Sequence, residues 1–162
     1  TDATDVGDLT VAKQGVTGQS STTSGYTSAG WDGSSLSNVI EKFPFASDAN
    51  STDVGDVTLG RWGPAGQSSS SSGYASGGWI VPSYIDTIDK FPFASDGNAT
   101  DVGDLTISRY GTAGQSSAAS GYTSGGFPSL DTIDKFPFAS DTNATEVGEL
   151  SVSRRFATGQ QY

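Results

Sequence analysis

The chain has 162 residues, no Cys, Met or His, and 8 Lys and Arg against 18 Asp and Glu, for a formal net charge of −10. Without Cys or His it forms no disulfide, no zinc or haem site of the usual kind and no Ser-His-Asp triad. The acidic excess argues against binding to nucleic acid, which depends on Lys and Arg. The sequence has no run of 18 apolar residues, so we expect no membrane insertion.

A unit of about 45–48 residues recurs along the chain, which is the signature of a repeat architecture. The stretch that begins Asp5-Val6-Gly7 returns from Asp53, from Asp101 and, with Glu in place of Asp, from Glu146. A disordered chain would not keep its aromatic residues at fixed spacing, so we expect a folded one. We predict one repeat domain over 1–162, with approximate repeats 5–52, 53–100, 101–145 and a partial repeat 146–162.

Short β-strands are expected within each unit. Apolar residues alternate with polar ones, Gly and Pro interrupt every candidate helix, and clusters of Gly, Ser and Asn mark turns. In the second unit the pattern predicts strands at Gly55–Arg61, Ala65–Ser70, Gly73–Trp79 and Thr87–Ala94. The same alternation in the third unit predicts a shared core of Leu105, Ile107, Phe136 and Phe138.

Two strands of each unit consist almost entirely of small residues. Such strands fit where several sheets converge and large side chains have no room, as around the axis of a β-propeller. The expected fold is therefore all-β, a β-propeller of four-stranded blades, with three blades and part of a fourth. Rings of this kind close with about 4–8 blades, so we expect self-association or a larger assembly to complete the propeller.

The order of motifs within a unit resembles a kelch repeat, and the resemblance covers essentially the whole chain. A small-residue strand leads to an aromatic residue and a Gly pair, as at Tyr74 and Gly77-Gly78, and the unit ends on a basic residue. The closing basic residues are Lys13, Arg61, Arg109 and Arg154. The resemblance implies a kelch-like propeller. The chain departs from the kelch pattern after the polar turn, where Val replaces the usual Trp at Val6, Val54, Val102 and Val147.

The wording of the repeats, such as Phe43–Asp48 (FPFASD), also resembles repeat arrays in structural proteins of marine cyanophages and pelagiphages. That resemblance implies a structural protein of a virion, such as a phage tail or fibre, and a virion or extracellular location. It implies no enzymatic activity.

The polar loop of each unit places oxygen-bearing side chains at alternate positions, as calcium loops do. The candidate metal ligands are Asp48, Asn50, Asp96, Asn98, Asp141 and Asn143. The glycine of a calcium loop is missing from the sixth place and the glutamate from the twelfth, so we favour a turn that bonds its own backbone. We therefore expect no cofactor, with calcium as the open alternative. The N-glycosylation sequons in these loops have the same two explanations, modification or a duplicated turn.

A loop of variable length follows the Gly pair and carries aromatic residues beside Asp and Ser. Aromatic rings stack on sugars, and loops on a rigid scaffold are common binding sites. The candidate glycan-binding residues are Trp31, Trp79, Tyr84 and Phe127. The alternative is that these rings cap the sheets and shield the small-residue strands.

Carboxylate pairs such as Asp86 with Asp89, and Asp131 with Asp134, are candidates for acid–base catalysis, but their recurrence predicts solvated positions on a strand. We therefore expect no enzyme. The expected function is a non-enzymatic structural or adhesive module of a virion or extracellular assembly. The alternative is a carbohydrate-binding lectin propeller that uses the loop aromatics, with surface glycans as partners.

Overall fold

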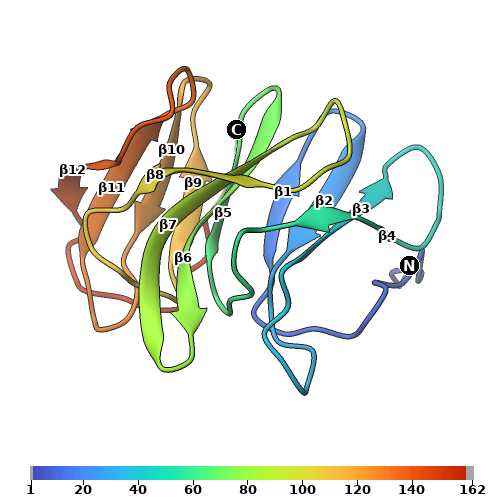
Figure 1. Cartoon of the computed structure of the whole chain (residues 1–162), viewed down its shortest axis with the longest axis horizontal. Coiled ribbons are helices and arrows are strands. Elements are labelled where there is room, and N and C mark those ends of the chain that lie inside the picture. The colour runs from blue at the N-terminus through green and yellow to red at the C-terminus, as the bar shows by residue number, and fades with distance from the viewer. Residues whose placement is uncertain (1, 160–162) are drawn as a thin grey trace.

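The computed structural model describes residues 2–159, which form three four-stranded antiparallel sheets (Figure 1). In each sheet the strands pair in chain order. The first sheet contains β1 (Thr17–Ser20), β2 (Ser24–Ser28), β3 (Val39–Pro44) and β4 (Thr52–Asp56). The second contains β5 (Ala65–Ser68), β6 (Ser72–Ile80), β7 (Ser83–Pro92) and β8 (Thr100–Asp104). The third contains β9 (Ala113–Ser116), β10 (Ser120–Ser124), β11 (Thr132–Pro137) and β12 (Thr145–Glu149).

The described part of the chain is all-β, as the alternation predicts, and contains no helix. Accordingly, these residues include no helix of the length and apolarity needed to cross a membrane.

Three of the four strands expected in the second unit lie close to their expected positions, as β5, β6 and β7. The fourth, expected at Gly55–Arg61, is wrong. The strand is β4, Thr52–Asp56, and it pairs with β3 of the preceding sheet. The chain then leaves this sheet, because Val57 and Arg61 are buried against the next sheet while Leu59 between them is 47% exposed.

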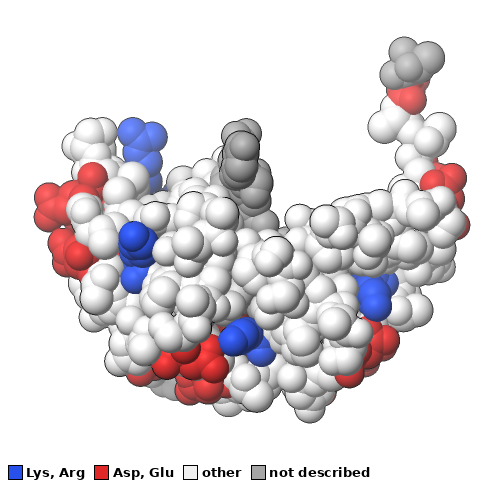
Figure 2. Space-filling view, turned by 90° about the horizontal axis from the view of Figure 1, so that it is seen from above, with Lys and Arg blue, Asp and Glu red and all other residues white. Residues whose placement is uncertain are grey.

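The three sheets follow one another along an arc (Figure 2). The first strands of the sheets, β1, β5 and β9, lie where the sheets meet, with β5 in contact with both of the others (Figure 1). We call these three the inner strands. These inner strands approach so closely that a glycine is required where they meet. A Cβ added to Gly66 would lie 2.3 Å from the carbonyl oxygen of Gly18, and one added to Gly114 would lie 2.1 Å from that of Gly66. The small residues predicted for these strands therefore have a steric cause.

Apolar side chains fill the space between adjacent sheets. Tyr26, Ile40 and Phe91 form a buried cluster between the first two sheets, and the corresponding residues Tyr74, Ile88 and Phe136 form one between the second and third.

The expected core of the third unit is confirmed in part. Leu105 and Phe136 are buried in the second cluster and Phe138 packs partly buried against it. The prediction that Ile107 belongs to this core is wrong, because its side chain is 40% exposed. The alternation fails at Ile107 because residues 105–109 are not a strand.

A buried ion pair joins three of the four closing basic residues to the third strand of the sheet that follows each of them. Arg61 pairs with Asp89 on β7, Arg109 lies 2.6 Å from Asp134 on β11, and Lys13 pairs with Glu41 on β3. The three carboxylates are fully buried. The expectation that Asp89 and Asp134 are solvated is therefore wrong, because their cationic partners lie 25 to 28 residues upstream, outside the reach of the local alternation.

We predict that Gly114→Ala lowers the free energy of unfolding by about 2 kcal/mol or more, because the new methyl group overlaps the backbone of β5. Gly97→Ala is the matched control: a Cβ there meets nothing within 4 Å, and the φ of Gly97 is not positive. The control should change stability by less than about 1 kcal/mol. Urea denaturation followed by circular dichroism measures both. Equal losses would show that the inner strands are not in close contact.

We also predict acid sensitivity at the first ion pair. Burial opposes ionisation of Glu41, but hydrogen bonds from Lys13, Ser51 and Thr10 outweigh it and hold the pKa of this carboxyl below its ordinary value of 4.5. A depressed folded pKa contributes stability that is present above pH 4.5 and is lost as the pH falls through the folded value. Glu41→Gln should be less stable at pH 7 and lose less stability than the parent between pH 7 and pH 3. Thermal melts between pH 7 and pH 3 measure this. A melting temperature that falls as steeply with pH in Glu41→Gln as in the parent would contradict the prediction.

Candidate binding site

Three short backbone bridges lie at the end of the sheets where β2, β6 and β10 finish. Each joins the residue that follows a closing basic residue to the aromatic residue that follows the Gly pair: Gln14 to Trp31, Trp62 to Trp79 and Tyr110 to Phe127. The Trp62 and Trp79 backbones exchange hydrogen bonds of 3.0 and 2.8 Å. Because the buried ion pairs hold one side of each bridge, the aromatic side chains are carried on a fixed backbone.

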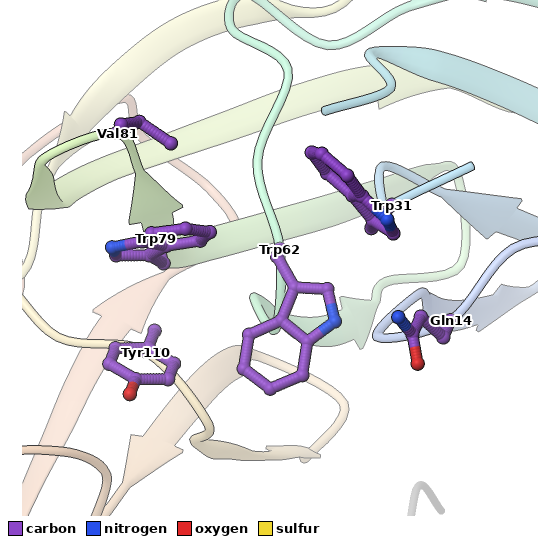
Figure 3. A pocket seen from close by; sticks show the side chains of 6 residues that line it. All are labelled: Gln14, Trp31, Trp62, Trp79, Val81 and Tyr110. Carbon is purple, nitrogen blue, oxygen red and sulfur yellow. The ribbon is translucent and has the colours of Figure 1, made fainter. Parts of the chain in front are cut away.

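Side chains from these bridges enclose a pocket of about 440 Å³. Its lining residues are Gln14, Trp31, Trp62, Trp79, Val81 and Tyr110. In Figure 3 the indole of Trp62 stands in the middle, with Trp31 and Gln14 on one side and Trp79 and Tyr110 on the other. The pocket is therefore an aromatic surface to which all three sheets contribute.

Glycines in the left-handed region let the rings sit this close to the backbone. Gly15 has a φ of 65°, and a Cβ there would lie 1.9 Å from the Trp62 indole nitrogen. Gly63 and Gly111 have the corresponding φ values of 66° and 62°. Gly63 donates to the carbonyl of Gly15 at 2.9 Å, and Gly111 to that of Gly63 at 2.8 Å. These bonds link the three bridges into one continuous rim.

A cluster of further rings supports the pocket from one side. Tyr110 lies with ring centroids 5.2 Å from both Tyr84 and Phe127, and 5.6 Å from Trp62. Phe156 packs edge-on against Trp62 at 5.6 Å. These contacts restrict the rotamers of Trp62 and Tyr110, so the pocket is preformed.

The four predicted glycan-binding residues all lie in or beside this pocket, but only two of them line it. Trp31 and Trp79 line the pocket, whereas Tyr84 and Phe127 pack against Tyr110 beside it. Sequence reasoning missed Trp62 and Tyr110. Their signal was their place directly after Arg61 and Arg109, but the first unit has Gln14 there, so no aromatic pattern recurs in every unit.

The side chain of Asp32, beside Trp31, forms hydrogen bonds within its own turn. Its carboxylate accepts hydrogen bonds from the backbone N–H of Ser34 and of Ser35, both at 2.7 Å, and from both hydroxyl groups. These bonds, those from the Ser35 and Ser34 backbone first, hold the pKa of Asp32 far below its ordinary value. Asp32 therefore stabilises the loop that carries Trp31.

Five of the six candidate metal ligands of the polar loops, all but Asp48, bond to another part of the chain. Asn50, Asn98 and Asn143 accept a backbone hydrogen bond at 3.0 to 3.2 Å from Asp8, Asp56 and Asp104 respectively. Asp96 and Asp141 pair with Lys42 and Lys90 of the preceding unit at 3.0 and 2.8 Å. Across residues 2–159, the structure assembles no group of three or more acidic, His or Cys side chains that would hold a metal ion. The geometry fits a junction turn better than a calcium loop.

Comparison with known proteins finds no matching family model and no matching curated protein.

We predict that a chelator leaves the melting temperature unchanged, because five of the six candidate ligands already have protein partners. A cation bound only to the folded state would stabilise it by about 2.7 kcal/mol at a hundredfold excess over its dissociation constant. Melting with EDTA and with added calcium measures this. A drop in melting temperature with EDTA, restored by calcium, would contradict the prediction.

Proposed function

We propose that this chain is a non-enzymatic binding module of a virion or extracellular assembly, built as part of a kelch-like β-propeller, and that its aromatic pocket takes a sugar ring. The observation that carries the proposal is the pocket itself, in which Trp31, Trp62 and Trp79 converge with Tyr110. Its volume of about 440 Å³ lies within the range of small-ligand sites.

The chemistry of the lining favours a ligand with flat apolar faces and polar edges. An aromatic ring has a negative face that attracts weakly positive C–H groups, and the face of a pyranose presents several of these. The amide of Gln14 and the hydroxyl of Tyr110 donate to or accept from ligand hydroxyl groups. None of the six lining residues carries a carboxylate, amine or imidazole, so the lining favours binding over acid–base catalysis.

The propeller part of the proposal rests on the way the sheets succeed one another. Both junctions between sheets use the same cluster, the same buried ion pair and the same glycine contact between inner strands. Repeating one junction around an axis generates a ring of sheets. The arc of Figure 2, together with the contacts of β5 with β1 and β9, supports three blades of such a ring.

A second ligand chemistry fits the same pocket. Aromatic cages bind quaternary ammonium groups through the negative faces of their rings. The net charge of −10 would attract such a cation. Choline is therefore the competing ligand that any sugar titration has to include.

Tryptophan fluorescence tests the proposal directly, because the chain has three tryptophans and all of them line the pocket. Titration with glucose, galactose, mannose, N-acetylglucosamine and choline should give a saturable change in emission with one of the sugars. Calorimetry should show affinity for that sugar at least about tenfold weaker in Trp62→Ala and Trp79→Ala, each of which removes a stacking face.

Phe45→Ala is the matched control, since it removes a 56% exposed aromatic ring outside the pocket and should leave the affinity unchanged. Saturable binding of choline, with no binding of any of the sugars, would show that the ligand is a cation and not a sugar. Binding that survives both Trp62→Ala and Trp79→Ala would show that the pocket is not the site.

A further inference from the structure

The junction between adjacent sheets occurs twice inside the arc. The outer faces of the first and third sheets, at the two ends of the arc, correspond to the two sides of that junction. We call the exposed face of the first sheet the leading face, formed by Thr27, Phe43, Phe45 and Asp48. We call the exposed face of the third sheet the trailing face, formed by Gln115, Tyr122, Ser124 and Lys135. Each internal junction shows which groups of a leading face meet which groups of a trailing face.

The first complementarity is aromatic. At the first junction Tyr26 lies 5.5 Å from Phe91 and 4.8 Å from Phe93, as ring centroids. At the second, Tyr74 contacts Phe136 and Phe138 at 5.5 and 4.9 Å. Tyr122 holds the same position on the trailing face, but the part of the chain that is described supplies no further pair of phenylalanines for it.

The leading face carries such a pair with no tyrosine from a preceding sheet. Phe43 and Phe45 lie 6.0 Å apart with an interplanar angle of 72°. Phe91 with Phe93 and Phe136 with Phe138 both lie 5.9 Å apart, at 78° and 75°. Phe43 and Phe45 also line a groove of about 330 Å³ with Gln19 and Tyr26. The receiving site for a tyrosine is therefore already formed.

The second complementarity is a hydrogen bond that is missing. The hydroxyl oxygen of Thr123 is bonded across the second junction by Gln67 Nε2 at 2.9 Å and by the Ser76 hydroxyl at 2.7 Å. Thr27 holds the same position on the leading face, and its hydroxyl oxygen is buried without a partner. A buried hydroxyl without a hydrogen bond is costly. Gln115 and Ser124 of a trailing face are the groups that would satisfy it.

The third complementarity is electrostatic. Lys42 pairs with Asp96 across the first junction, and Lys90 pairs with Asp141 across the second. Lys135 of the trailing face and Asp48 of the leading face hold the corresponding positions. Their charges are opposite, so a trailing face attracts a leading face.

We propose that the trailing face of one copy of this chain docks on the leading face of a second copy. Tyr122 then enters the Phe43–Phe45 pair, Gln115 and Ser124 bond Thr27, and Lys135 pairs with Asp48. Two such junctions, related by a two-fold axis, join six sheets, within the about 4–8 of known propellers. The proposal does not depend on what the aromatic pocket binds.

One feature of each junction between copies differs from the internal ones. Residues 5–13 and 146–154 are equivalent stretches of the repeat, so a junction between copies has room for one of them and releases the other. Arg154 and Lys13 are the equivalent basic residues, and they compete for Glu41. Residues 146–154 of the docking copy displace residues 5–13 of its partner, because Arg offers more donors to a buried carboxylate than Lys does.

Sedimentation equilibrium of the full chain over a range of concentrations tests this docking. We expect a dimer whose dissociation constant rises at least about tenfold in Tyr122→Ala and in Phe45→Ala, each of which removes one ring of the junction. Val81→Ser is the matched control, because Val81 is 66% exposed on the pocket rim and lies on neither face. It should leave the dimer unchanged.

A charge exchange keeps the test decisive if the alanine variants unfold. Lys135→Glu and Asp48→Lys should each weaken their own homodimer, since like charges then meet at both junctions. An equimolar mixture of the two should associate as the parent does, because both junctions of the mixed dimer pair opposite charges. A chain that stays monomeric up to about millimolar concentration, where weak interfaces associate, would overturn the proposal. So would a dimer unaffected by these changes, which would place the contact elsewhere or with a different partner.

Discussion

The rest of the structure depends on the buried ion pair between a closing basic residue and a carboxylate on the sheet that follows it. Arg61 shows how completely this group is used: it pairs with Asp89 and donates to the carbonyls of Gly77 and Thr87. Burial lowers the pKa of the Arg61 guanidinium, and the charge of Asp89 opposes that effect. Two charges buried together are tolerated because each satisfies the other, and removing either leaves an unpaired buried charge.

That ion pair determines where the neighbouring elements lie. It draws residues 57–61 out of the sheet that ends with β4 and onto the next sheet, which brings the inner strands into contact at Gly18, Gly66 and Gly114. The residue after the basic residue is thereby held at the end of the sheets, where it bridges to an aromatic residue that follows β2 or β10 or lies near the end of β6. The aromatic pocket is therefore a consequence of the same junction that joins the units, and its walls come from successive sheets.

Much of this arrangement is predictable from the sequence, and the part that is not has a common cause. Repetition and period-2 alternation predict the strands β5, β6 and β7, and small residues predict the convergence of inner strands. The alternation of Val57, Leu59 and Arg61 resembles a strand, but Arg61 is positioned by a carboxylate 28 residues away in the chain. Asp89 is predicted to be solvated for the same reason, since its partner Arg61 is too far away in the chain for a local pattern to show the pairing. The sequence predicts Trp31 and Trp79 as candidate binding residues but not Trp62, because the bridge of Trp62 joins two segments that no local pattern connects.

A double-mutant cycle on Arg61 and Asp89 tests the central claim most directly. Urea unfolding of Arg61→Met, Asp89→Leu and the double variant gives three free energies to compare with the parent. If the junction depends on this pair, each single change lowers the free energy of unfolding by about 3–5 kcal/mol, because it leaves a buried charge without a partner. The double variant then loses far less than the sum, with a coupling energy of about 2 kcal/mol or more. Single losses below about 1 kcal/mol that simply add would show that the sheets are joined by their apolar clusters alone.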